Sequence, residues 1–396
     1  MPRPLDGIKV LDLSKVLAGP LCAQYLGDLG AEVIKVEAVG HGDETRGWPP
    51  FPAAGLGTVF LSANRNKRSI AIDMKSGKGR KLVHELAKSA DVAIESFGTG
   101  VAERLGIDAV SLCALNDRLV HCSISGFGRT GPLKNSPGYD VILQAFSGIM
   151  SMTGDEGGGY IRSPISPIDQ MTGVHAFSGI LASLLAREKS GKGAAIQVSL
   201  FDTALGLLGY NLQTFWEKGT QPAKCGSSHE SLCPYQAFEA ADGPIMIGVA
   251  NDNLWRKFCA VAGLNAIVDD PRFRTNADRV RHRAETLQHV QSVIAGNSVA
   301  HWNAVLNEVG IPCSPINSLA QLLDHPHTRA DQRIMQYDHP AAGRLNCVGH
   351  PVTFVGEERN PGLPPPMLGQ HTDDVLKEIG LSAASIAELR REQIVG

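Results

Sequence analysis

Residues 8–37 read IKVLDLSKVLAGPLCAQYLGDLGAEVIKVE, and their pattern decides the fold. The runs 8–13 and 32–37 are rich in aliphatic and β-branched residues, which is typical of buried strands. The stretch between them, 18–29, carries apolar residues at helical spacing. A strand, a helix and a second strand in this order predict a right-handed unit with two parallel strands.

The same alternation continues after this unit. It predicts an α/β fold with a mostly parallel sheet. A ligand of nucleotide size is then expected outside the carboxyl ends of the strands. No G-x-G-x-x-G follows the first strand, so dinucleotide binding has little support. The further predicted strands are 69–73, 91–95 and 119–124, and the further helices are 79–89 and 101–106.

The character of the chain changes after a predicted strand at 195–199 and the helices around it, 170–187 and 200–217. A polar, glycine-containing stretch at 219–233 indicates a linker. A hairpin with Asp242-Gly243 as its turn then begins a smaller α+β unit. The predicted elements of that unit are strands 234–240 and 245–249 and helices 252–263, 284–295 and 300–309, and a last helix is predicted at 372–390.

Composition describes an ordinary globular protein of 396 residues, with 43% hydrophobic and 19% charged residues. A net charge of −3 gives no electrostatic case for nucleic acid or a membrane surface as partner. No apolar run approaches the roughly 20 residues of a membrane span. The eight cysteines show neither C-x-x-C nor zinc-type spacing, so we expect reduced thiols, no metal site and a cytoplasmic location.

Asp169 follows two prolines, Pro164 and Pro167, and precedes apolar residues at helical spacing. This position predicts the start of a buried helix. Considered alone, Asp169 is interpreted as a helix N-cap, since aspartate is favoured there. The segments around it change that interpretation.

Several segments gain meaning when they are read together in order. They resemble the family III CoA-transferases (the CaiB/BaiF family), the group that contains formyl-CoA and carnitine-CoA transferases. The resemblance runs nearly from end to end. The segments that carry it, besides 163–173 around Asp169, are Leu17-Ala18-Gly19-Pro20, Glu32-Val33-Ile34-Lys35-Val36-Glu37, Gly42-Asp43, Asn64-Arg65-Asn66-Lys67-Arg68-Ser69, Gly126-Phe127-Gly128, Pro137-Gly138-Tyr139-Asp140 and Leu368-Gly369-Gln370-His371-Thr372.

The resemblance implies a ring-like subunit in an interlocked homodimer. Residues 1–220 and 325–396 would form a Rossmann-like large domain that binds CoA and holds the catalytic aspartate. Residues 226–320 would form the small α+β domain, with connecting linkers near 219–233 and 320–330. The proline-rich stretch 360–366 would then belong to a wrapped connection.

The resemblance also places the catalytic nucleophile at Asp169. Its carboxylate would attack an acyl-CoA to give a mixed anhydride and then a β-aspartyl-CoA thioester, from which CoA passes to a free carboxylic acid. Tyr139 and Asp140 match positions that flank the catalytic site, where they would bind the reacting carboxyl groups and position the acceptor. The glycine-rich residues 154–159 would supply an oxyanion-binding loop, or else form a surface turn. No prosthetic group is implied; coenzyme A and acyl-CoA are substrates.

Contacts to coenzyme A are implied for eight residues. The backbone of Val16 and Ala18 would line the pantetheine arm, and Lys75 and Arg104 would supply charges for the phosphates. For these two cations the alternative is an ordinary solvated charge. The residues expected around the adenine are Ile72, Met74, Lys75, Ser96 and Phe97.

Departures from the family pattern bear on the acceptor. Leu17 stands where the formyl-CoA enzyme has a glutamine, and Ser96 replaces an asparagine, which argues against oxalate. Succinyl-CoA and a short dicarboxylate are the expected substrates, with Arg162 as one candidate anchor for a distal carboxylate. An α-methylacyl-CoA racemase is one alternative, although such enzymes carry histidine at the position of Tyr139, and tyrosine, with an ordinary pKa of about 10, is a poor base. A CoA-binding paralogue without catalysis is the other.

Overall fold

The computed structural model describes residues 3–51, 55–356 and 358–396; residues 1, 2, 52–54 and 357, which fall inside the predicted large domain, lie outside that description. Contacts divide the chain into two compact units. Unit 1 contains Met1–Ser147, Ser163–Gly209 and Ala330–Gly396, and unit 2 contains Gly148–Arg162 and Tyr210–Arg329. The segment 148–162 had been assigned to the large domain from the sequence, whereas its contacts lie mainly with unit 2.

A six-stranded sheet forms the centre of unit 1, in the order β3-β2-β1-β4-β5-β6, and all its strand pairs are parallel. This confirms the predicted α/β class. The order reverses between β1 and β4, which places a topological switch point there. The strands are β1 (Lys9–Asp12), β2 (Glu32–Glu37), β3 (Lys67–Ala71), β4 (Val92–Glu95), β5 (Val120–Ser125) and β6 (Ala194–Ser199).

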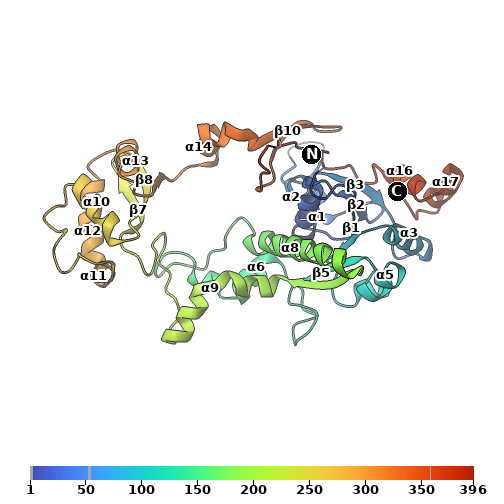
Figure 1. Ribbon diagram of the computed structural model, residues 1–396, viewed down its shortest axis with the longest axis horizontal. Coiled ribbons are helices and arrows are strands. Elements are labelled where there is room, and N and C mark those ends of the chain that lie inside the picture. The colour runs from blue at the N-terminus through green and yellow to red at the C-terminus, as the bar shows by residue number, and fades with distance from the viewer. Residues whose placement is uncertain (1–2, 52–54, 357) are drawn as a thin grey trace. The chain divides into compact units, whose positions relative to one another are not determined.

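Helices cover this sheet (Figure 1). One apolar cluster packs α3, α5, α16 and α17 against the sheet, including Leu11 of β1 and Leu13 just after that strand. Because side chains alternate along a strand, Val10 and Asp12 face the other side, toward α1. There α1 packs closely on α8. The helices of unit 1 are α1 (Ala18–Asp28), η1 (Glu44–Gly47), α2 (Thr58–Ala63), α3 (Gly77–Lys88), α4 (Val101–Leu105), α5 (Ala109–Leu115), α6 (Asp140–Phe146), α8 (Pro167–Ser190), η2 (Ala330–Gln332), α16 (Thr372–Glu378) and α17 (Ala383–Arg391).

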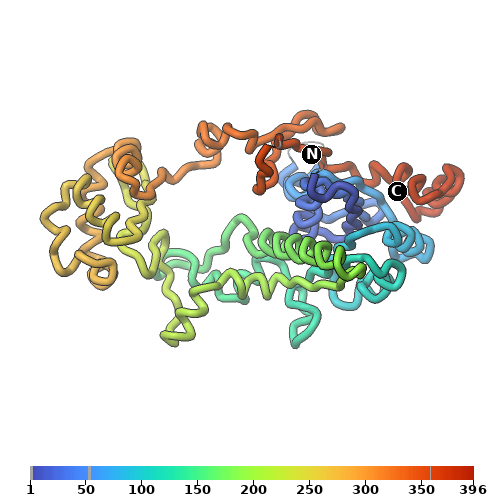
Figure 2. The backbone as a smooth tube through the Cα atoms, in the orientation of Figure 1, coloured from blue at the N-terminus to red at the C-terminus, as the bar shows by residue number. Residues whose placement is uncertain are grey.

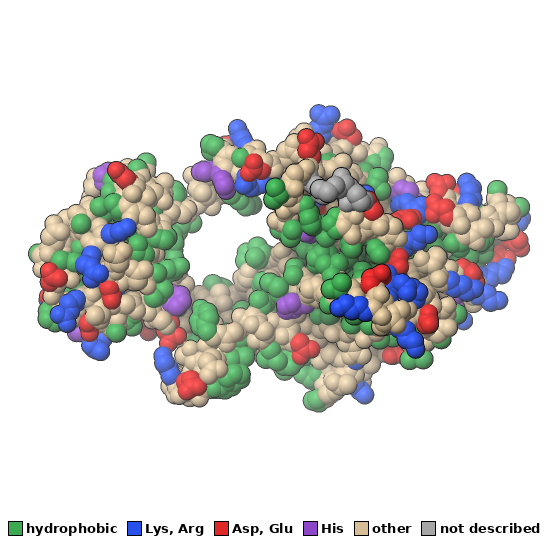
Figure 3. All heavy atoms as spheres, in the orientation of Figure 1, with side chains coloured by type: hydrophobic (Ala, Val, Ile, Leu, Met, Phe, Trp, Pro, Cys, Tyr) green, Lys and Arg blue, Asp and Glu red, His purple; other side chains and the backbone are tan. Residues whose placement is uncertain are grey.

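The end of the chain returns to the first strands, as Figure 2 shows by the red segment beside the blue one. The backbone N–H of His371 donates to the Ser69 carbonyl (2.9 Å), and that of Gly396 donates to the Ala71 carbonyl (3.1 Å). Charged side chains of both signs mingle around α16, α17 and α3 (Figure 3), where Lys78 pairs with Glu392 at 2.6 Å. An antiparallel hairpin, β10 (Ile334–His339) and β11 (Gly343–Val348), precedes this segment and was not predicted.

Unit 2 contains a three-stranded antiparallel sheet in the order β7-β8-β9. Its first hairpin lies where it was predicted, but the two residues of its turn are Ala241 and Asp242, because Gly243 already pairs with Ala240 as the first residue of β8. Trp255, Phe258 and Phe273 are fully buried in its core, between the sheet and the helices. Its elements are α7 (Ile149–Met152), β7 (Tyr235–Ala240), β8 (Gly243–Gly248), α10 (Asp252–Val261), α11 (Asn276–Arg281), α12 (Arg283–Ile294), α13 (Val299–Glu308), β9 (Cys313–Pro315), α14 (Leu319–Asp324) and α15 (Pro326–Arg329).

Helix α9 (Leu200–Lys218) contains a break at Gly209, whose φ of 43° and ψ of −119° are not helical. The two units divide at this residue. None of the helices within the described ranges is long and apolar enough to cross a membrane.

Candidate active site

A cavity of about 340 Å³ opens at the carboxyl ends of β1, β4 and β5 in unit 1. The segments that follow these three strands form its wall, so it lies at the switch point of the sheet, where ligands of such folds bind. Asp169 and Tyr139 both line it. The other lining residues are Lys15, Val16, Leu17, Ala18, Gly19, Glu44, Ser96, Phe97, Gly98, Thr99, Ile124, Ser125, Gly126, Arg129, Lys134, Asn135, Ser136, Pro137, Gly138 and Leu200.

Two glycines bring Tyr139 to this cavity. A Cβ on Gly126 would lie 2.9 Å from the Cα of Gly138, so the two backbones touch where the segment after β5 folds back. No larger residue fits at this contact. The result is that Tyr139, at the start of α6, stands at the end of β5 with about half of its side chain exposed.

Asp169 is the third residue of α8, whose N-cap is Ser166 without a side-chain cap bond. The predicted capping role of Asp169 is therefore wrong. Asp140 supplies the cap: its Oδ2 accepts hydrogen bonds from the backbone N–H groups of Ile168 (2.8 Å) and Asp169 (3.1 Å). These are two of the N–H groups that a helix start leaves without partners. The Asp169 side chain remains available to the cavity.

Gln144 completes this arrangement. Its Nε2 donates to the Oδ1 of Asp140, and its Oε1 accepts from the backbone N–H of Ser163 (2.8 Å). Asp140 is 4% exposed and Gln144 fully buried. Within the described residues, Asp140 does not line the cavity. Its contacts show that it holds the start of α8, and its predicted role in positioning the acceptor stays a prediction.

Burial and, to a smaller extent, the negative charge of Asp140 together raise the pKa of Asp169 to about 7. The first turn of a helix favours the ionised form, but this effect is worth at most about 2 kcal/mol. The desolvation of the carboxylate therefore dominates. A carboxylate with such a raised pKa in a cavity is a candidate functional group.

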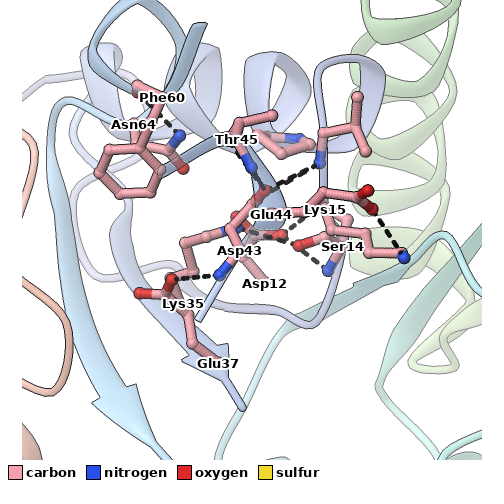
Figure 4. Close-up of polar contacts among 12 residues, drawn as sticks. Asp12, Ser14, Lys15, Lys35, Glu37, Asp43, Glu44, Thr45, Phe60 and Asn64 are labelled. Carbon is pink, nitrogen blue, oxygen red and sulfur yellow. Dashed lines mark hydrogen bonds and ion pairs between the residues drawn. The ribbon is translucent and has the colours of Figure 1, made fainter. Parts of the chain in front are cut away.

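Buried charged side chains bind the segment 14–20, of which residues 15–19 line the cavity. Lys35 and Lys67 come from the neighbouring strands β2 and β3, and both are almost completely buried. Lys67 Nζ lies 2.9 Å from Asp12 Oδ2, and Lys35 Nζ lies 3.1 Å from Asp43 Oδ2. Figure 4 shows Asp12, Lys35 and Asp43 directly beside Ser14 and Lys15. The sequence indicated these ion pairs, because a charged residue within a buried strand requires a partner of opposite charge.

Four of the eight residues predicted to contact coenzyme A line the cavity: Val16, Ala18, Ser96 and Phe97. The other four do not. Ile72 is fully buried and takes part in a bridge with Val395, so its side chain is not available to a ligand. Met74 packs against the same apolar cluster as Phe97, while Lys75 and Arg104 are exposed. Arg162, the candidate carboxylate anchor, is exposed and belongs to unit 2.

Arg129 is a site residue that sequence reasoning missed. Its guanidinium donates to Glu95 Oε1 (2.7 Å), the Phe97 carbonyl (2.9 Å) and Ser123 Oγ (2.9 Å). Glu95 in turn accepts from the Phe97 N–H (2.8 Å). The two charges thus fix the turn that carries Phe97. Only the position of Glu95 at the end of a buried strand indicated such a pair.

The described residues contain no group of three His, Cys, Asp or Glu side chains that could hold a metal ion. The charged and phenolic side chains that line the cavity are Asp169, Glu44, Tyr139, Lys15, Arg129 and Lys134. A partly desolvated carboxylate suits nucleophilic attack on an activated acyl group.

The chain is similar to known proteins over nearly its whole length. The sequence pattern of CoA-transferase family III matches residues 5–372. Succinyl-CoA:glutarate CoA-transferase from Mus musculus is 38% identical over 95% of this chain and 86% of that protein. Acetyl-CoA:oxalate CoA-transferase from Acetobacter aceti is 38% identical over 91% of this chain and 92% of that protein. The crystal structure of a CaiB/BaiF family protein from Brucella suis matches with a TM-score of 0.83 at 34% identity, over 96% of this chain and all of that one. The chain is an enzyme that belongs to CoA-transferase family III.

Proposed function

We propose that this enzyme transfers coenzyme A from succinyl-CoA to a short dicarboxylic acid, with Asp169 as nucleophile. The observation that carries the proposal is the Asp169 carboxylate in the cavity, with a pKa raised to about 7. A carboxylate with that pKa is a better nucleophile than one with an ordinary pKa, and a large fraction is still ionised at neutral pH.

The reaction proceeds through two kinds of acyl intermediate on Asp169. Its carboxylate oxygen attacks the thioester carbon, the C–S bond breaks, and a mixed anhydride and CoA thiolate form. The thiolate then attacks the aspartyl carbon, the donor acid leaves as a carboxylate, and a β-aspartyl-CoA thioester remains. The acceptor carboxylate repeats these steps in reverse. No proton is gained or lost overall, so the site needs water exclusion more than a general base.

Relatives and charges support the choice of substrates. The mouse relative is named for succinyl-CoA and glutarate, and the bacterial relative for acetyl-CoA and oxalate. Both acceptors are dicarboxylates. In the cavity wall, Val16–Gly19 and Ser96–Phe97 offer backbone and apolar surface for the pantetheine arm, and Lys134 supplies positive charge. Lys15 and Arg129 also line the cavity but pair with Glu44 and Glu95. Lys75 and Arg104 remain proposed ligands of the CoA phosphates.

The test incubates the enzyme with succinyl-CoA and separate acceptors, including glutarate and oxalate, and follows the new CoA thioester by mass spectrometry. We expect Asp169→Asn to abolish transfer. Asp169→Glu displaces the carboxylate by about 1 Å and should cost on the order of 100-fold. Borohydride should reduce the trapped thioester on the peptide that contains Asp169. Transfer by Asp169→Asn at the wild-type rate would overturn the proposed nucleophile.

The racemase alternative has its own readout. A racemase exchanges the α-proton of an acyl-CoA with D₂O without any acceptor acid. We expect no such exchange with 2-methylacyl-CoA, because Tyr139 occupies the position of the racemase histidine. A paralogue without catalysis would bind CoA and transfer it to none of the acids.

We also propose that the active form is a homodimer, interlocked as the family resemblance implies. Large apolar side chains are exposed along α6, α8 and α9, including Phe146 (55%), Leu185 (68%) and Trp216 (69%). Apolar surface of this extent commonly marks an interface. Light scattering coupled to gel filtration should give twice the mass of the 42.2 kDa chain.

A further inference from the structure

Residues 15–19 line one wall of the cavity, and the segment 14–20 that contains them has a strained position. Val16 has a φ of 72°, in the left-handed region. A β-branched residue is rare there, and such a conformation persists only where the surroundings impose it. The question is what imposes it.

Both ends of this segment are bound by buried ammonium groups. Lys35 Nζ donates to the Ser14 carbonyl (2.9 Å), and Lys67 Nζ donates to the Pro20 carbonyl (2.8 Å). Hydrogen bonds to charged groups are stronger than those between neutral groups. Lys35 thus binds the first residue of the segment, and Lys67 binds the last.

The acidic partners of these lysines bind the N–H groups of the same segment. Asp12 accepts from the Ser14 N–H (3.0 Å), and both oxygens of Asp43 lie within 3.4 Å of the Val16 N. Asp43 also accepts from Thr45 N and Oγ1, which fixes its rotamer (Figure 4). Ser96 Oγ accepts from the Lys15 N–H (3.0 Å) at the open side. The N–H groups of Ser14, Lys15 and Val16 therefore each have a charged or fixed partner.

The segment also touches the helix that carries the nucleophile. A Cβ on Gly173, one turn after Asp169, would lie 2.8 Å from the Ala18 carbonyl oxygen. A movement of residues 14–20 would change the distance between this wall and Asp169. Burial also lowers the pKa of Lys67 to about 8, although the negative charge of Asp12 acts to raise it.

We infer that Lys35 and Lys67 are positioning residues of the transferase reaction: their ammonium groups hold residues 14–20 in the conformation that shapes the CoA-binding wall beside Asp169. The expected loss of kcat/KM in lysine variants rests on the proposed function. The expected loosening of residues 14–20 does not. Neither lysine lines the cavity among the described residues.

The experiment compares Lys35→Met and Lys67→Met with Arg187→Met. Arg187 is 3% exposed, pairs with the partly exposed Asp91 at 2.9 Å and lies near the far end of α8, so its loss removes the ion pair of a buried cation away from the cavity. Hydrogen exchange of the full-length protein reports on residues 13–20. Calorimetry with coenzyme A gives Kd, and succinyl-CoA with glutarate gives kcat/KM.

In the lysine variants we expect exchange in 13–20 to be about tenfold faster or more, the factor that corresponds to one lost hydrogen bond to a charged group. We expect kcat/KM to fall by roughly 10- to 100-fold, as for a misplaced site, and Kd for coenzyme A to rise. Arg187→Met should lower the Tm by a similar amount and leave all three quantities near wild type. Should the Met variants not fold, Lys35→Gln and Lys67→Gln, which keep a neutral donor, should show smaller changes in the same direction.

Unchanged exchange in 13–20, or an equal change in Arg187→Met, would overturn the inference. If the wild-type enzyme transferred CoA to no acid, the proposed function would fail, while the exchange difference would still stand.

Discussion

Asp140 accepts a hydrogen bond from the backbone N–H of Asp169 at 3.1 Å, so the residue whose charge helps to raise the pKa of Asp169 also fixes the start of its helix. A carboxylate is well suited to both tasks, because it accepts helix N–H groups and repels a second negative charge. Asp169, the proposed nucleophile, is thereby kept partly protonated and in a defined place.

Asp140→Asn separates these two roles. The amide oxygen still accepts from α8, but the charge that helps to raise the pKa of Asp169 is gone. We expect the acidic limb of the kcat/KM–pH profile to move to lower pH than in the wild type, whose limb lies near the Asp169 pKa of about 7. The amide nitrogen would face Gln144, so a modest loss of stability is expected as well. An unmoved acidic limb would contradict the electrostatic role.

Asp169→Asn should stabilise the protein in a pH-dependent manner. The pKa of Asp169 is about 7 in the folded state and near 3.8 in the unfolded chain, so the folded state binds more protons between these values. The wild type therefore loses stability as the pH rises through about 7. The asparagine variant, which stays neutral, should show a Tm advantage that grows from pH 4 to pH 7 and then levels off. A constant difference across that range in thermal unfolding would argue against a raised pKa.

Gly173→Ala tests the contact between α8 and the cavity wall. The added methyl group would meet the Ala18 carbonyl oxygen at 2.8 Å, and a backbone atom cannot yield without moving the wall. We expect a loss of about 1–3 kcal/mol in urea unfolding together with a lower kcat/KM. Gly206→Ala in α9 is the control, because a Cβ there meets nothing within 4 Å. That variant should be more stable by up to about 1 kcal/mol with unchanged kinetics.

Arg129→Met should leave Glu95 buried without its ionic partner. Breaking such a pair costs about 3–5 kcal/mol, and the turn that carries Phe97 loses its support. We expect a lower midpoint of urea unfolding and a raised KM for the acyl-CoA. The double variant Arg129→Met/Glu95→Gln should recover part of the stability, because it removes the unpaired charge. If the double variant were no more stable than Arg129→Met, the pairing would not explain the loss.

Most of the α/β framework could be predicted because buried parallel strands leave a strong aliphatic pattern. The sequence of the β10–β11 hairpin has a weaker aliphatic pattern. Met335, Tyr337 and His339 alternate with exposed residues, yet their sequence is mostly polar. The antiparallel partner that explains this alternation lies across a short turn near Gly343.

The site was predictable only in part for a similar reason. The position of Asp169 after two prolines indicated a helix start, but its cap comes from Asp140, 29 residues earlier. Local sequence favours a local cap, and no propensity identifies a distant one. Lys35 and Lys67 were visible as charges inside strands, although their partners depend on how β1, β2 and β3 assemble.

The ionic support beneath residues 14–20 has a consequence for redesign of this enzyme. Asp12, Lys35, Asp43 and Lys67 depend on one another, so a change at any one of them requires compensation at the others. Leu17, Ser96 and Tyr139 contribute to the cavity wall. Libraries that aim at a new acid substrate should therefore vary these wall positions and leave the four buried charges untouched.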